Sequence, residues 1–134
     1  MLSHELIIRV RYAEVDRMGY LHHGNYAAYF EAGRTELLRE LGLSYSQMED
    51  EGVIMPVRDL KIRYFEPVLY DEEVVVKTVL HQMPTVKIEF DCVIENKFGT
   101  RCCEAKIVLV FVDANRRKPI KAPEYFLELV RPFF

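Results

Sequence analysis

The N-terminal part of the chain changes from a strand pattern to a helix pattern. Residues 5–12 alternate apolar and polar positions, as a strand with one buried face does. Residues 13–24 interrupt this alternation with charges, two histidines and glycines, which predicts a loop. From Asn25 to about Leu41 apolar residues recur at steps of three and four, which predicts a helix capped by Asn25 and ended by Gly42. The first turns of this helix have little polar surface, so a broad apolar surface must cover them.

The rest of the chain predicts a sheet. Residues 44–51 indicate a short helix or turn, and alternating or valine-rich runs then predict four strands. These strands span 58–66, 73–80, 86–95 and 101–112, and a last helical turn is expected at 123–130. The order of one strand, one helix and four strands predicts an α+β fold in which an antiparallel sheet covers the helix. Since such a sheet leaves one face and its edges uncovered, we expect the chain to self-associate.

Length and composition favour one domain covering residues 1–134. No apolar run approaches the ~20 residues of a membrane helix, and the first residues lack the pattern of a signal peptide. The 3 cysteines are an odd number without metal-binding spacing, so we expect reduced thiols, no metal and a cytoplasmic protein. A net charge of −3 argues against nucleic-acid binding.

The residues able to perform chemistry gather just before the predicted helix. Asp16 lies in the loop, seven residues before His23 at the helix start. A helix N-terminus presents free N–H groups and partial positive charge, which can hold a carbonyl oxygen as negative charge develops on it. A nearby carboxylate can activate water or attack the carbonyl itself. Together these groups indicate acyl transfer.

The pattern D-x-x-G-x-x-x-H-x-N-Y, followed by F-E-x-x-R, resembles the 4-hydroxybenzoyl-CoA thioesterase family, and most closely its bacterial short acyl-CoA thioesterase branch. The resemblance extends over nearly the whole chain and includes Arg-Tyr-Phe-Glu-Pro at 63–67. It implies a hotdog fold, in which a five-stranded antiparallel sheet wraps around one long helix. It also implies a homodimer or homotetramer with active sites between subunits, and hydrolysis of acyl-CoA to a carboxylic acid and free coenzyme A without cofactor or metal.

The resemblance also assigns roles to residues. Asp16 matches the general base or nucleophile, and the choice between these roles stays open. His23 matches the residue whose backbone N–H lies near the thioester carbonyl, so that the helix start at His23 and Gly24 polarises this carbonyl. Further positions shape the pocket and the tight loop, and they are matched by Tyr12, Gly19, Asn25 and Tyr26. Gly24 stands where the family more often has alanine.

Other polar residues have two interpretations each. Glu31 and Arg34 match the helix acid and base of the family, but an ion pair between them is the simpler expectation. We expect His22 to be a solvated loop residue. The basic residues Arg116, Arg117, Lys118 and Lys121 are either a solvated loop or contacts for the phosphates of coenzyme A, and Arg63 is a weaker candidate for the same contact.

Three alternatives remain at this stage. Thioesters of acyl carrier protein are a variant substrate class for the same reaction. A non-enzymatic module that binds acyl-CoA or acyl carrier protein would have the same fold but no need for Asp16. A hotdog dehydratase would normally use a different arrangement of histidine and acid.

Overall fold

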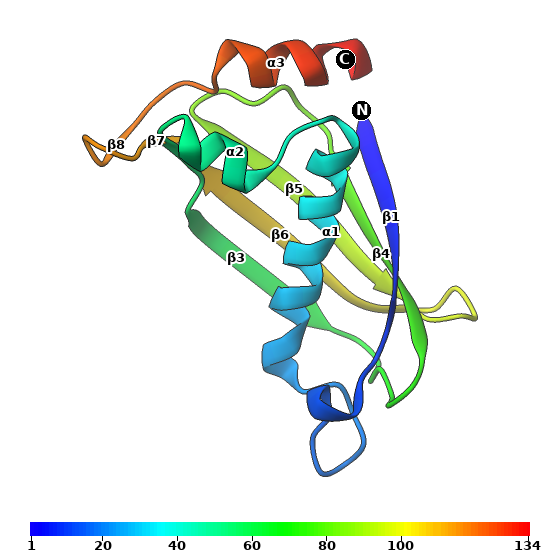
Figure 1. Cartoon of the computed structure of the whole chain (residues 1–134). Coiled ribbons are helices and arrows are strands. Elements are labelled where there is room, and N and C mark those ends of the chain that lie inside the picture. Colours follow the sequence, from blue (N-terminus) through cyan, green and yellow to red (C-terminus); the bar gives the residue numbers. More distant parts are fainter.

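A five-stranded antiparallel sheet wraps around one long helix in the computed structural model, which describes all 134 residues (Figure 1). From edge to edge the strands are β1 (Leu2–Arg9), β4 (Glu73–Leu80), β5 (Lys87–Glu95), β6 (Arg101–Val110) and β3 (Val57–Tyr64). Helix α1 (Tyr26–Glu40) lies across one face of this sheet. The predicted α+β architecture with a long central helix is therefore confirmed.

Shorter elements close the ends of the sheet. They are the helices α2 (Tyr45–Asp50) and α3 (Glu124–Val130), the 3-10 turns η1 (Tyr12–Glu14), η2 (His23–Asn25) and η3 (Arg131–Phe133), and a small sheet of β2 (Val53–Ile54), β7 (Val112–Asp113) and β8 (Lys118–Pro119). None of the helices is long and apolar enough to cross a membrane.

Predicted and observed strand bounds differ, and the first and last strands show why. The first strand spans residues 2–9 rather than 5–12, because its partner β4 begins only at Glu73, opposite Arg9. The last strand ends at Val110, and Val112 then pairs with Ile54 in the small sheet. The continuous apolar run at 107–112 gives no sign of this change of sheet.

Helix α1 approaches the sheet closely because of Gly33. A Cβ atom at Gly33 would lie 2.7 Å from Oγ1 of Thr78 and 2.8 Å from Cγ1 of Val76, both on β4. Phe30 and Leu37, one turn to either side, are almost fully buried. Burial of one such side chain stabilises the fold by about 1.5–3 kcal/mol, so this face of the helix anchors it to the sheet.

Strand β3 forms an edge of the sheet that nothing in the chain covers. It pairs with β6 only, and its large apolar side chains Val57, Leu60 and Tyr64 are each more than 40% exposed. An edge with unpaired backbone groups and exposed apolar side chains is suited to pairing with another strand.

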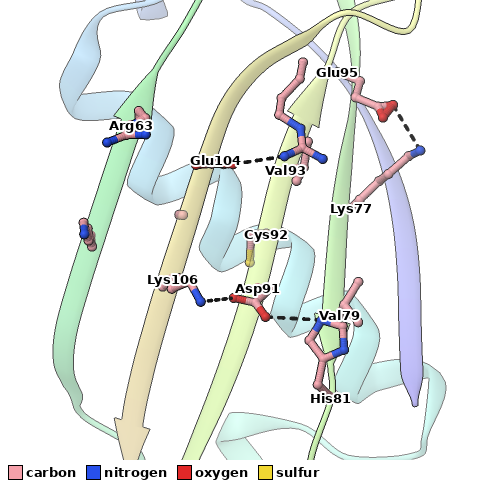
Figure 2. Close-up of a pocket in the computed structure, with 13 residues that line it drawn as sticks. Arg63, Lys77, Val79, His81, Asp91, Cys92, Val93, Glu95, Glu104 and Lys106 are labelled. Atoms are coloured by element: carbon pink, nitrogen blue, oxygen red, sulfur yellow. Dashed lines mark hydrogen bonds and ion pairs between the residues drawn. The ribbon is translucent and has the colours of Figure 1, made fainter.

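The outer face of the sheet carries charged side chains and an open depression of about 570 Å³, shown in Figure 2. The ion pairs on this face include Lys77–Glu95, Lys106–Asp91 and Arg101–Glu104. Exposed pairs of this kind contribute little to stability. Helix α1 lies behind the sheet in this view, so the depression is separate from the helix start.

Candidate active site

The loop between β1 and α1 folds back on itself beside the start of the helix. Val15 pairs with Leu21 as an isolated antiparallel bridge, and the amide of Asp16 donates to the carbonyl of Tyr20 at 2.8 Å. Gly19 completes the reversal with a φ of +79°, a left-handed value that favours glycine. The loop is therefore a small hairpin with Asp16 at its base.

The side chain of Asp16 is half-buried and oriented by its own loop. Its Oδ1 atom accepts hydrogen bonds from the amides of Met18, at 2.9 Å, and Tyr20, at 3.3 Å. An aspartate that closes a turn makes contacts of this kind. They also fix the direction of the carboxylate and leave Oδ2 without a protein partner, so that one oxygen can act on a bound group.

Glu14 ties this loop to the helix. Its carbonyl oxygen accepts from the amide of His22, at 2.9 Å, and from the side-chain amide of Asn25, at 2.8 Å. Its carboxylate accepts from the Tyr29 hydroxyl and from the amide of Arg11, both at 2.8 Å. Burial disfavours the Glu14 carboxylate, but the hydrogen bonds from Arg11 and Tyr29 outweigh burial and lower the pKa of Glu14. A charged Glu14 therefore holds the loop against the first turns of the helix.

The helix begins with one amide that has no acceptor. The amide of Gly24 donates to Nδ1 of His22 at 3.0 Å, and the amide of Asn25 donates to the carbonyl of His22 at 2.8 Å. The amide of His23, the first residue of η2, makes no hydrogen bond with the protein. Contrary to the expectation from sequence, Gly24 is not available as a second donor to a carbonyl. The free donor at this helix start is His23.

The residue that caps the helix is His22, whereas the sequence predicted Asn25. Asn25 already has helical φ and ψ of −86° and −16° and makes no capping hydrogen bond. The reason is that η2 extends the helical stretch by three residues, which places the cap at position 22. His22 is exposed and lies outside the helix, as expected of a solvated loop residue, but it also caps the helix start.

Strand β3 contacts the helix start through Tyr64. The Tyr64 hydroxyl donates to the carbonyl of His23 at 3.0 Å, and its ring meets that of Tyr26 edge-on, with centroids 4.9 Å apart. Tyr26 is buried, and burial raises the pKa of its hydroxyl to about 12. Tyr12, in contrast, is 79% exposed and meets Tyr70 edge-on. Of the two tyrosines predicted to shape the pocket, only Tyr26 lies at the helix start.

Glu31 and Arg34 do not form the predicted ion pair. Glu31 is exposed, whereas Arg34 is 6% exposed and its Nε atom has no hydrogen-bond partner. No ion pair joins the two charges, although both side chains lie near enough to Tyr45 to influence its hydroxyl. Arg34 lies near Tyr45, whose hydroxyl pKa is raised by burial against the opposing effect of the Arg34 charge.

The predicted phosphate-binding cations lie away from the Asp16 loop of the same chain. Arg63 lines the depression on the outer face of the sheet (Figure 2). Arg116, Arg117 and Lys118 are exposed in and beside the turn between β7 and β8, at the opposite end of the sheet from the helix start (Figure 1). One chain therefore does not bring these cations to Asp16.

Sequence reasoning missed three residues that shape this site: Glu14, His22 and Tyr64. Glu14 had a detectable signal, because it is an acid two residues before Asp16 in a loop that must be held in place. The contact of Tyr64 joins segments about forty positions apart and has no local signal. The structure gathers no group of three or more histidine, cysteine or acidic side chains that could hold a metal ion.

A sheet wrapped around a helix, with a carboxylate loop at the free N-terminus of that helix, defines a protein of the hotdog class. Residues 10–130 match the thioesterase-like superfamily, and the chain belongs to this superfamily. It is 40% identical over 119 residues to the "Putative acyl-CoA thioesterase YneP" of Bacillus subtilis, covering 89% of this chain and 86% of that protein. It is 31% identical over 117 residues to the acyl-CoA thioester hydrolase YbgC of Escherichia coli, with 87% of each covered.

Solved structures agree with this assignment. The DHNA-CoA thioesterase of Staphylococcus aureus superposes with a TM-score of 0.90 at 34% identity, covering 99% of this chain and 89% of that one. The fold and these relatives make the chain a hotdog-fold enzyme of the thioesterase class.

Proposed function

We propose that this protein hydrolyses acyl-CoA thioesters to a carboxylic acid and free coenzyme A, as a member of the bacterial short acyl-CoA thioesterase branch of the 4-hydroxybenzoyl-CoA family. The observation that carries the proposal is the unpaired His23 amide, on a helix start that Glu14 ties to the Asp16 loop. The names of the two relatives and of the solved structure above support the same chemistry.

The His23 amide donates to the carbonyl oxygen of the bound thioester. The positive end of α1 then stabilises the negative charge that develops on this oxygen during attack. Asp16 promotes attack on the carbonyl carbon in one of two ways. Either it takes a proton from the attacking water, or its carboxylate attacks, expels the thiolate of coenzyme A and forms an anhydride that water cleaves.

The complete site requires a second copy of the chain. The free edge of β3 pairs antiparallel with the same edge of another copy in a homodimer. Antiparallel pairing places the beginning of one β3 beside the end of the other, where Tyr64 contacts His23. The β7–β8 turn adjoins the beginning of β3, so Arg116, Arg117 and Lys118 of one copy approach the helix start of its neighbour and bind the phosphates of coenzyme A.

The free thiols of the three cysteines are consistent with a reducing compartment. Cys92, Cys102 and Cys103 are free and buried, and burial raises the pKa of Cys92 and of Cys103 to about 12. Such thiols react slowly, so they contribute little background when released coenzyme A is measured as a thiol. We assign the protein to the cytoplasm on this basis.

The proposal is tested with a panel of aliphatic and aromatic acyl-CoA thioesters, scored for free thiol and for the carboxylic acid. We expect stoichiometric release of both, and faster release from acyl-CoA than from the same acyl group on acyl carrier protein. Tight binding of acyl-CoA without thiol release would instead show a binding module. A change in acyl unsaturation without thiol release would show a dehydratase.

A further inference from the structure

The imidazole of His22 caps the helix whose start faces the substrate. Its Nδ1 atom accepts the Gly24 amide at 3.0 Å, and its backbone is extended, with φ of −61° and ψ of 136°. The ring also stacks on the ring of His23, with centroids 4.2 Å apart and an angle of 28° between the planes. Helix caps are usually serine, threonine, aspartate or asparagine, whose short side chains carry an oxygen acceptor. Here a histidine does the same with a ring nitrogen.

Gly24 provides the space that this cap needs. A Cβ atom at position 24 would lie 3.2 Å from Nδ1 of His22, which is tighter than ordinary contact, and 3.4 Å from Cε1 of the same ring. Gly24 has no left-handed φ, so its backbone conformation does not require glycine. The glycine is explained by the ring folded over it, and residues 22 and 24 therefore act as a matched pair.

This cap decides which amide remains free. The side chain of His22 occupies the Gly24 amide, and its carbonyl occupies the Asn25 amide. Only the His23 amide is left to meet a substrate. The same cap fixes the first helical turn, to which His23 belongs, and thereby the direction of its N–H.

We propose that His22 is a positioning residue for thioester hydrolysis, which orients the His23 amide toward the substrate carbonyl by capping the helix over Gly24. This role rests on the proposed function of the site. In this role His22 acts through the His23 amide and not on a reacting atom.

The cap requires a particular protonation state. Nδ1 can accept only when the proton of the neutral ring is on Nε2, and a doubly protonated imidazole has no acceptor left. The titratable groups around His22 are the stacked His23 ring, the Tyr64 hydroxyl on the His23 carbonyl, and Glu14, whose carboxylate is engaged by Arg11 and Tyr29. None of them forms an ion pair with His22.

The first test compares three forms of the full chain, wild type, His22→Ala and His22→Asn, on one acyl-CoA substrate. Loss of a cap of ordinary strength predicts that His22→Ala lowers kcat about fivefold with little change in KM, and that His22→Asn restores kcat to within about twofold. Equal kcat in His22→Ala and wild type, or no recovery of kcat in His22→Asn, would overturn the proposal.

The pairing with Gly24 provides a second test. Gly24→Ala in the wild-type background displaces the ring and lowers kcat, whereas the same substitution in His22→Ala has no further effect. Independent, additive losses would contradict a shared role of the two residues.

A spectroscopic measurement separates this proposal from the proposed function. Nitrogen-15 NMR of the histidine side chains at neutral pH is expected to show His22 with a proton on Nε2 and an accepting Nδ1, and slow exchange of the Gly24 amide that His22→Ala abolishes. A proton on Nδ1 of His22 would overturn the cap whatever the activity. If wild type releases no thiol from any acyl-CoA, the proposed function fails and the hydrolytic role of His22 fails with it. Full activity in His22→Ala removes only the role of His22.

Discussion

Glu14 connects the two halves of the site through its backbone and its side chain. Its carbonyl binds His22 and Asn25, and its carboxylate binds Arg11 and Tyr29. We predict that Glu14→Gln lowers the free energy of unfolding by about 1.5–3 kcal/mol, the range for hydrogen bonds to a charged group. Urea denaturation measures this change. The matched control is Glu36→Gln, which removes a more exposed ion pair on α1 and should cost less.

The lowered pKa of Glu14 adds a pH dependence to this prediction. A carboxyl group with a lower pKa in the folded state stabilises the fold above its unfolded value, and the stabilisation is lost as the pH falls through the folded value. The ordinary pKa of a glutamate is 4.5. Wild type should therefore lose stability more steeply than Glu14→Gln as the pH falls below about 4.5. Parallel stability curves for the two proteins would contradict the account of Glu14.

The sequence identified site residues where their spacing along the chain marks them. The spacing from Asp16 to His23 and the apolar helix after it mark the site in the sequence. The cap at His22 depends on which way an imidazole rotates and on a 3-10 turn that precedes α1, and spacing reports neither. The ion pair expected from the spacing of Glu31 and Arg34 fails because one side chain is buried and the other is exposed.

At the scale of elements, the contact between α1 and β4 sets how deeply the helix lies in the sheet. We predict that Gly33→Ala destabilises the fold by about 1–3 kcal/mol, because its Cβ would overlap Thr78 and Val76. This cost must exceed the gain of up to about 1 kcal/mol from helix propensity. Thermal or urea unfolding measures the difference. The control is Ala28→Gly at an exposed position of the same helix, which isolates the propensity effect.

A stable or stabilised Gly33→Ala protein would show that the helix can move away from β4 at no cost.

The order of the main elements was predictable, because strand and helix periods differ and the turns between them are rich in glycine and polar residues. The ends of β1 and β6 were not, since they depend on where a partner strand begins or where the chain changes sheets.

For the whole molecule, the free edge of β3 predicts assembly. Wild type should sediment as a dimer or a larger oligomer, and Leu60→Asp should shift it toward monomer and lower its activity, because a charge then replaces an exposed apolar side chain of β3. Ile7→Asp is the matched control, since Ile7 is 65% exposed on β1, at the other edge of the sheet. A monomeric and active wild type would contradict a site built from two copies.

Self-association was predicted from an uncovered sheet, but the sequence did not show which edge is free. Both β1 and β3 are edge strands, but β3 carries three large exposed apolar side chains and its end contacts the helix start through Tyr64. The sequence also could not predict that residues 116–118 lie far from Asp16 within one chain, because this distance depends on the path of β3 along the whole sheet.

The central claim is that Asp16 acts on a carbonyl held at the His23 amide. The most direct test is the turnover of Asp16→Ala on the acyl-CoA that wild type hydrolyses fastest, with circular dichroism to show that the variant is folded. Asp50→Ala, an exposed aspartate on α2, is the control and should keep wild-type turnover. We predict that Asp16→Ala loses at least ~10²-fold in kcat, as expected when a catalytic base or nucleophile is removed. A folded Asp16→Ala protein with turnover close to wild type would contradict the claim.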